Sequence, residues 1–200
     1  MTEADATNSP FLVVGLGNPG PRYETTRHNV GHMVLDELAE RTTPMPSAFS
    51  THKKSNTDTI ETRWGDTKVI LAKPRSFMNT SGGPIKALAK FFHVPADRIV
   101  VVHDELDLDF GTVRLKFGGG ENGHNGLKST SSALGTRDYV RVRIGVGRPP
   151  GRQDPADYVL RPFSHQEAAD LGAICAQAAD GIELLVSRGL AYAQNEIHSR

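Results

Sequence analysis

A short run of apolar residues near the start of the chain restricts the fold more than any other feature. Residues 11–16 read FLVVGL, with no polar side chain to mark a solvent-facing side. Such strands are buried on both faces, as happens when helices cover both sides of a largely parallel sheet. A second apolar run lies within RIVVVHDEL, at residues 98–106, and ends in a cluster of acids. The two runs predict an α/β fold whose sheet is flanked by α-helices on both faces.

Further strands follow from alternation and turn residues. Residues 59–65 and 67–73 are predicted as consecutive strands of a hairpin that turns at Gly65 and Asp66. Residues 112–117 and 139–147 alternate polar and apolar side chains, as half-buried strands do. Because a hairpin pairs its strands antiparallel, the sheet is predicted to be mixed.

Three helices are predicted from apolar spacing and capping residues. One begins near His28, and a second follows Ser81, which is predicted to be its N-cap. The third follows a capping box at Ser164 and ends beside Gly189. No linker or repeat divides the chain, so we predict a flexible tail over residues 1–9 and one domain over residues 10–200.

Composition narrows the possible cofactors and locations. Cys175 is the only cysteine, which excludes an internal disulfide and a cysteine-based metal cluster. No apolar stretch approaches the roughly 18 residues of a membrane span, and the polar N-terminus does not resemble a signal peptide. We therefore expect a soluble, cytoplasmic protein.

Charge is balanced overall but segregated along the chain. The sequence holds 23 basic and 23 acidic residues. Residues 112–152 nevertheless contain eight Lys and Arg residues against two acids. A neutral protein can carry a basic face, and this segment is the predicted position of one.

The first apolar run leads into GLGNPG, at residues 15–20, which fits the dinucleotide-binding pattern G-x-G-x-x-G. That pattern needs a helix directly after its last glycine, to hold a pyrophosphate at the helix N-terminus. Here Pro19 and Pro21 interrupt the chain, and the helical pattern starts only near His28. A nicotinamide-dependent oxidoreductase is therefore disfavoured. Asn18 either presents its amide to a ligand at this strand end or merely closes the turn.

Two polar residues could carry acid–base chemistry. His28 could act as a general base or could be a surface or capping histidine. With His32 one turn later it could also bind a metal, but the expected glutamate and a third ligand are missing. Asp104, at the end of a buried strand, could hold an imidazole in one tautomer. The sequence has no serine nucleophile elbow, and Cys175 lies on a core stripe, so water is the expected attacking group.

Two further motifs lie at strand-to-helix turns. KPRSFMNTSGG, at residues 73–83, is predicted to expose Phe77 and Met78, followed by Asn79. The glycine-rich GGGENGHNG, at residues 118–126, leads into a fourth, weaker helical pattern. It brings Asn125 near the N-terminus of that helix and near Lys116, which together suit a phosphate. These groups suggest water-mediated hydrolysis of a phosphate-bearing substrate. A non-catalytic RNA-binding module remains the alternative.

Four segments in this order resemble the bacterial peptidyl-tRNA hydrolase family: GLGNPGPRYETTRHNVGH, KPRSFMNTSG, VVHDELDLDFGTVRLKFGGGENGHNGLKS and RVRIGVGRP. The resemblance runs from about Phe11 to the C-terminal helix. It implies cleavage of the ester between a peptide and the tRNA 3′ ribose, which recycles tRNA from abandoned translation. It also implies a monomeric single domain with no metal, no cofactor and no obligate protein partner.

The resemblance implies a role for each matching residue. His28 matches the catalytic histidine, Asp104 its paired aspartate, and Asn18 an asparagine that orients substrate or water. The peptide and tRNA-end channel is matched by Tyr23, Phe77, Met78, Asn79 and Asn125. Basic residues implicated in tRNA contact are matched by Lys116 and Arg143. Glu121 and Asn122 are a small departure within the glycine loop, where the family varies.

Overall fold

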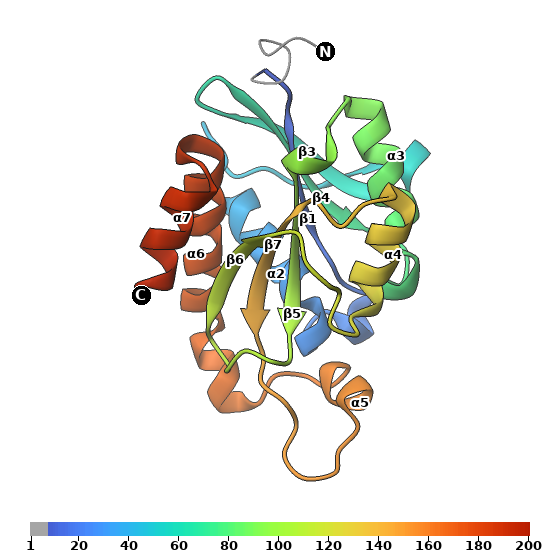
Figure 1. Cartoon of the computed structure of the whole chain (residues 1–200), viewed down its shortest axis with the longest axis vertical. Helices are drawn as coiled ribbons and strands as arrows, with labels where there is room; N and C mark the ends of the chain where they lie inside the picture. The colour runs from blue at the N-terminus through green and yellow to red at the C-terminus, as the bar shows by residue number, and fades with distance from the viewer. Residues whose placement is uncertain (1–7) are drawn as a thin grey trace.

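Seven strands form one mixed sheet in the order β2-β3-β4-β1-β5-β7-β6 in the computed structural model, which describes residues 8–200 (Figure 1). The strands are β1 (Phe11–Gly15), β2 (Ser50–His52), β3 (Thr57–Trp64), β4 (Thr67–Pro74), β5 (Ile99–Glu105), β6 (Val113–Phe117) and β7 (Val140–Gly145). The predicted tail over residues 1–9 lies almost wholly outside the described residues. The boundary between tail and domain stays a prediction.

The centre of the sheet is parallel and both of its margins are antiparallel. Strand β1 lies between β4 and β5, parallel to both, and β7 continues the parallel order beside β5. Strands β2, β3 and β6 run antiparallel to their neighbours. The predicted hairpin is confirmed, since Trp64 pairs with Thr67 across a two-residue turn in which Gly65 has a φ of 61°. The mixed sheet is confirmed with it.

Helices cover both faces of this sheet, as the buried strands predict. The covering helices are α2 (Val30–Glu40), α3 (Gly82–Phe92), α4 (Asn125–Leu134), α6 (His165–Arg188) and α7 (Leu190–His198). The short helix α5 (Pro155–Val159) lies beyond the strand ends instead (Figure 1). Val13 packs in a core with α2, α6 and α7, whereas its neighbours Leu12 and Val14 pack in a second core with α3 and α4. Figure 1 shows α6 and α7 on one side of the sheet and α3 and α4 on the other. None of the helices in this part of the chain is both long and apolar enough to cross a membrane.

The helix ends differ in part from the predictions. Ser164 forms the predicted capping box with Glu167, and α6 ends beside Gly189. Ser81, in contrast, is not a side-chain cap, because its hydroxyl donates to the carbonyl of Met78 in the preceding turn. A further helix, α7, directly follows Gly189 and was not predicted.

A close contact between two glycines sets the position of α2 on the sheet. A Cβ on Gly31, in the first turn of α2, would lie 2.4 Å from the carbonyl oxygen of Val102 on β5. A Cβ on Gly15, at the end of β1, would lie 2.3 Å from the Gly31 carbonyl oxygen. Any side chain at either position would push the helix away from the strand ends. The two glycines therefore bring the start of α2 directly over the carboxyl ends of β1 and β5.

Candidate active site

A cavity of about 470 Å³ opens where three parallel strands end. The segments that follow β1 and β4, the last residues of β5 and the first residue of α4 all contribute to its wall. Ligands of open α/β sheets bind at the carboxyl ends of the strands, so the cavity lies where such a fold places its site. Of the ten predicted site residues, eight line it: Asn18, Tyr23, His28, Phe77, Met78, Asn79, Asp104 and Asn125.

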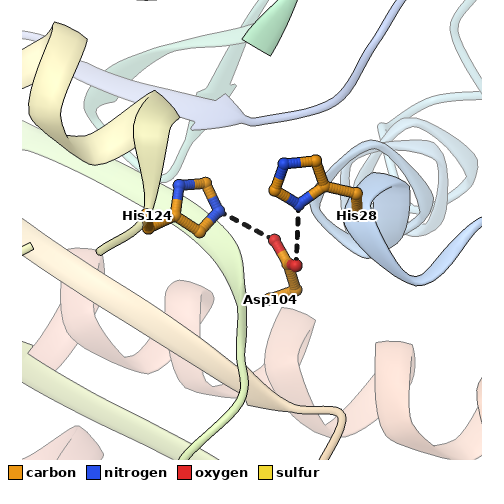
Figure 2. A group of neighbouring side chains, drawn as sticks. All are labelled: His28, Asp104 and His124. Atoms are coloured by element: carbon orange, nitrogen blue, oxygen red, sulfur yellow. Dashed lines mark hydrogen bonds and ion pairs between the residues drawn. The ribbon is translucent and has the colours of Figure 1, made fainter. Parts of the chain in front are cut away.

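Two histidines share one buried carboxylate in this cavity (Figure 2). His28 lies in a 3₁₀ turn (Arg27–Asn29) directly before α2, and its Nδ1 is 2.8 Å from Asp104 Oδ2. His124, the residue before α4, has its Nε2 2.8 Å from Asp104 Oδ1. Asp104 itself is 3% exposed and is the next-to-last residue of strand β5. Both carboxylate oxygens therefore have a histidine partner.

The hydrogen bonds fix which nitrogen of each ring carries a hydrogen. The backbone N–H groups of Gly126 and Leu127 donate to His124 Nδ1, so the hydrogen of this ring lies on Nε2 and points at Asp104. His28 likewise donates from Nδ1 to the carboxylate. Its Nε2, on the side of the ring away from Asp104, is then the nitrogen with a free lone pair (Figure 2). A ring in this tautomer can accept a proton at the cavity.

The electrostatics of the pair follow from burial and charge. Burial acts to lower the pKa of His28, but the charge of Asp104 and the hydrogen bond to it outweigh burial, so the pKa is raised above 6.5. Burial would raise the pKa of the Asp104 carboxyl, whereas the two histidines and their hydrogen bonds hold it well below its usual range. The carboxylate therefore stays charged at neutral pH.

The amide of Asn18 is fixed so that one polar group is left for the cavity. The backbone N–H of Met78 donates to Asn18 Oδ1 at 2.7 Å, which orients the side chain. Its Nδ2 group is then the donor that remains for a ligand. Asn18 is 7% exposed and lines the cavity beside His28.

The other predicted wall residues surround this centre, with one correction. Tyr23 and Phe77 pack edge to face with ring centroids 6.2 Å apart, and Phe77 is exposed. Asn79 and Asn125 are also exposed at the cavity. Met78 was predicted to be exposed, but only 4% of it is, because it packs in the core beneath α3 and α4.

Sequence reasoning missed several residues of the cavity. His124 lies in the quoted motif GGGENGHNG and is the N-cap of α4, but histidine is not among the usual N-cap residues, so the local sequence did not mark it. Asn122 donates to Glu105, and both line the cavity. The short helix α5 adds an apolar wall that no pattern in the sequence indicated: Pro155, Ala156, Val159 and Leu160.

Lys116 and Arg143 lie outside the cavity on a neighbouring surface. Lys116 on β6 pairs in register with Arg141 on β7, and Arg143 pairs with Arg114, so the four side chains share one face of the sheet. The pKa of Lys116 is lowered by burial and then by the charges of Arg143 and Arg141. Arg143 also lies 4.0 Å from Glu105 Oε1, so part of the positive charge beside the glycine loop is offset by an acid.

This basic face is smaller than the residue count predicted. Arg141 is fully buried and donates to the carbonyls of Gly119 and Gly120, so it holds the glycine loop rather than a ligand. Arg137 and Arg148 form ion pairs with acids. At the start of α4, the N–H groups of Gly126 and Leu127 already donate to His124 Nδ1, so a phosphate there would have to rely on other donors. The phosphate site stays a prediction.

The side chains of His28, Asp104 and His124 could also hold a cation by distance alone. The ligand atoms of His28, Asp104 and His124 all lie within 4.8 Å of one another. Each of these atoms is already engaged in a hydrogen bond, and His124 presents an N–H rather than a lone pair. The donor set therefore fits a hydrogen-bonded triad better than a metal centre, and the expectation of no metal stays a prediction.

Hydrolytic enzymes use a histidine that a buried carboxylate orients toward the substrate, and this cavity holds such a pair. The class defined by fold and site is therefore a single-domain α/β hydrolytic enzyme. A family model described as peptidyl-tRNA hydrolase matches residues 12–200. The peptidyl-tRNA hydrolase of Rhodococcus erythropolis is 61% identical over 187 residues, which cover 94% of this chain and 97% of that protein. The chain belongs to the peptidyl-tRNA hydrolase family.

Further relatives agree with this assignment. The peptidyl-tRNA hydrolase of Mycolicibacterium smegmatis is 58% identical over 190 residues, covering 95% of this chain and 98% of that protein. The crystal structure of peptidyl-tRNA hydrolase from Acinetobacter baumannii aligns with a TM-score of 0.87 at 32% identity, covering 94% of both chains. The chain is an enzyme that hydrolyses peptidyl-tRNA. Both alternatives, the nicotinamide-dependent oxidoreductase and the non-catalytic RNA-binding module, are therefore wrong.

Proposed function

We propose that His28 is the general base of this hydrolysis and that Asp104 orients it. The observation that carries the proposal is the 2.8 Å bond from His28 Nδ1 to Asp104 Oδ2, which leaves Nε2 free at the cavity. His28 Nε2 takes a proton from water as the water oxygen attacks the ester carbonyl carbon. Collapse of the tetrahedral intermediate breaks the bond to the ribose 3′ oxygen. That oxygen takes the proton from His28, giving free tRNA and a peptide with a carboxyl end.

We infer that Asn18 stabilises the developing oxyanion through Nδ2. The backbone N–H of Met78 donates to the Asn18 amide oxygen and fixes the plane of the amide. The Nδ2 group is therefore oriented before the substrate arrives. One donor of this kind contributes about 3 kcal/mol to the transition state in other enzymes. Asn79 and Asn125 are exposed at the same cavity and are proposed to bind the substrate's polar groups near the scissile ester.

We propose that the peptide follows the apolar wall and that the tRNA follows the basic face. Tyr23, Phe77 and Met78 offer aromatic and apolar contacts opposite the wall of α5. Lys116 and Arg143 would meet phosphates next to the cavity. We propose further that the enzyme acts in the cytoplasm as a monomer, with no obligate protein partner, no membrane and no cofactor.

The variant Asp104→Asn tests the role of the carboxylate with almost no change in shape. Because His124 presents an N–H, the new amide oxygen would turn to it and the NH₂ group would face His28. His28 Nδ1 would then have to accept, and the ring hydrogen would move to Nε2, where the base is needed. We expect kcat to fall by roughly 10³- to 10⁴-fold, as for the same change in a serine protease triad. A variant within about tenfold of the wild-type kcat would refute the proposed role of Asp104.

A further inference from the structure

We propose that Asn29 is a positioning residue for the hydrolysis, which acts by fixing the main chain of Asn18. This inference rests on the proposed role of Asn18 as oxyanion donor. Asn29 is next to His28 in the same 3₁₀ turn. A single turn would thus set the position of both the base and the donor.

Asn29 binds Asn18 in both directions. Its Nδ2 donates to the carbonyl oxygen of Asn18 at 2.9 Å, and its Oδ1 accepts from the Asn18 N–H, also at 2.9 Å. The two residues are 1% and 7% exposed, so water does not offer either group a replacement partner. One buried amide therefore satisfies both main-chain polar groups of Asn18 and fixes the direction of the backbone on each side of its Cα.

The first turn of α2 also packs against the segment that carries Asn18, on the side away from the cavity. The ring of His32, three residues after Asn29, lies against Gly17, where a Cβ would come within 2.7 Å of the ring. On the cavity side, Met78 N holds the Asn18 amide oxygen. With the backbone held by Asn29 and the amide oxygen by Met78, the Asn18 Nδ2 group has a single position relative to His28.

Loss of Asn29 is expected to lower kcat rather than substrate affinity, because the oxyanion forms only in the transition state. Asn29 is not among the residues that line the 470 Å³ cavity within the described chain, so it does not contact the substrate and can act only by positioning other groups. An oxyanion donor is effective only when it is held at the position where charge develops. Loss of the Asn29 bonds would let the loop shift, and a misplacement of about 1 Å can cost roughly 100-fold in rate.

A double-mutant cycle tests the inference. Asn29→Ala, Asn18→Ala and the double variant are compared with wild type in kcat and KM on N-acetyl-aminoacyl-tRNA. In the wild-type background, we expect Asn29→Ala to lower kcat by about 10- to 100-fold with KM changed less than about threefold. In the Asn18→Ala background, where no donor remains to be positioned, the same substitution should change kcat by less than about threefold.

The cycle separates failure of this inference from failure of the proposed function. If Asn18→Ala keeps the wild-type kcat, the proposed role of Asn18 is wrong. If Asn18→Ala lowers kcat but Asn29→Ala lowers it by the same factor in both backgrounds, Asn29 does not act through Asn18 and only the inference fails.

An isosteric variant and a matched control exclude a purely structural effect. In Asn29→Asp, the ionised carboxylate would face the Asn18 carbonyl oxygen, whereas the protonated carboxyl regains a donor toward it. The ratio of variant to wild-type kcat should therefore rise as pH falls, and a ratio independent of pH would overturn the inference. If Asn29→Ala does not fold, the cycle is run with Asn29→Asp. Thr42→Ala, which removes a buried hydroxyl at the far end of α2, should lower the melting temperature and leave kcat unchanged.

Discussion

His124 Nε2 lies 2.8 Å from Asp104 Oδ1, so the carboxylate that holds His28 on one oxygen is held by a second histidine on the other. The same His124 ring accepts from two N–H groups of the first turn of α4. One side chain therefore connects the start of a helix to the carboxylate of the proposed catalytic pair. A change at His124 is expected to affect both stability and rate.

Replacement of His124 by alanine tests this double connection. It removes the N-cap of α4 and leaves Asp104 Oδ1 buried without its histidine partner. We expect the free energy of unfolding to fall by at least about 1 kcal/mol, which is the cost of a lost cap, and more for the unpaired carboxylate. We expect kcat on peptidyl-tRNA to fall by about 10- to 100-fold, because Asp104 is no longer held in one orientation.

Ser164→Ala is the matched control for that variant. Ser164 caps α6 through its side chain and is not among the residues of the described chain that line the cavity. It should lose a similar free energy of unfolding, measured by urea denaturation, and keep the wild-type kcat. If His124→Ala behaves in the same way, His124 is a helix cap and nothing more.

The raised pKa of His28 predicts opposite effects of pH on rate and on stability. A general base must be unprotonated, so kcat/KM should fall as pH drops through a value above 6.5. Protonated His28 is favoured in the folded state. Its stabilising contribution is therefore fully present below the unfolded pKa and is lost as pH rises through the raised folded pKa.

Two pH series measure these effects. One follows kcat/KM from about pH 5 to pH 9, and the other follows the melting temperatures of wild type and His28→Gln over the same range. The difference in melting temperature should shrink as pH rises. An acid limb with its midpoint below 6.5 would contradict the assignment of His28 as the titrating base.

The basic face predicts an effect on binding rather than on chemistry. Lys116→Ala and Arg143→Gln should each raise KM and reduce the slope of log affinity against log salt by about one unit or less, since each removes one phosphate contact. The value of kcat should change little, because neither residue lines the cavity. Lys68→Ala, at the start of β4, is the control and should leave the salt slope unchanged. Unchanged slopes in all three variants would place the tRNA surface elsewhere.

The fold could be predicted from the sequence because its strongest patterns are local. FLVVGL is apolar throughout, and Val13 and its neighbours Leu12 and Val14 indeed pack into separate cores on opposite faces. The hairpin at Gly65 needs only one turn with positive φ. Helix α7 was missed because α6 and α7 are separated by Gly189 alone, and a helix end gives no sign that another helix begins there.

The candidate site was predicted less completely, for a physical reason. Asn18, His28 and Asp104 lie at strand ends or beside them, and strand ends of a parallel sheet converge on one edge. The partners that fix these groups are set by tertiary contacts instead. Asp104 and His124 are 20 residues apart and Asn18 and Met78 are 60 apart, and no spacing rule connects them. Arg141 likewise counts as a basic residue in the sequence, although its position on β7 buries it beneath the glycine loop.

The most direct test of the central claim is the single-turnover rate of His28→Ala on peptidyl-tRNA, measured with enzyme in excess. Loss of the base should lower this rate by about 10²- to 10⁴-fold, while the circular dichroism spectrum and tRNA affinity stay close to wild type. His165→Ala, an exposed histidine at the start of α6, serves as the control and should retain full activity. A His28→Ala enzyme that hydrolyses peptidyl-tRNA at the wild-type rate would contradict the account.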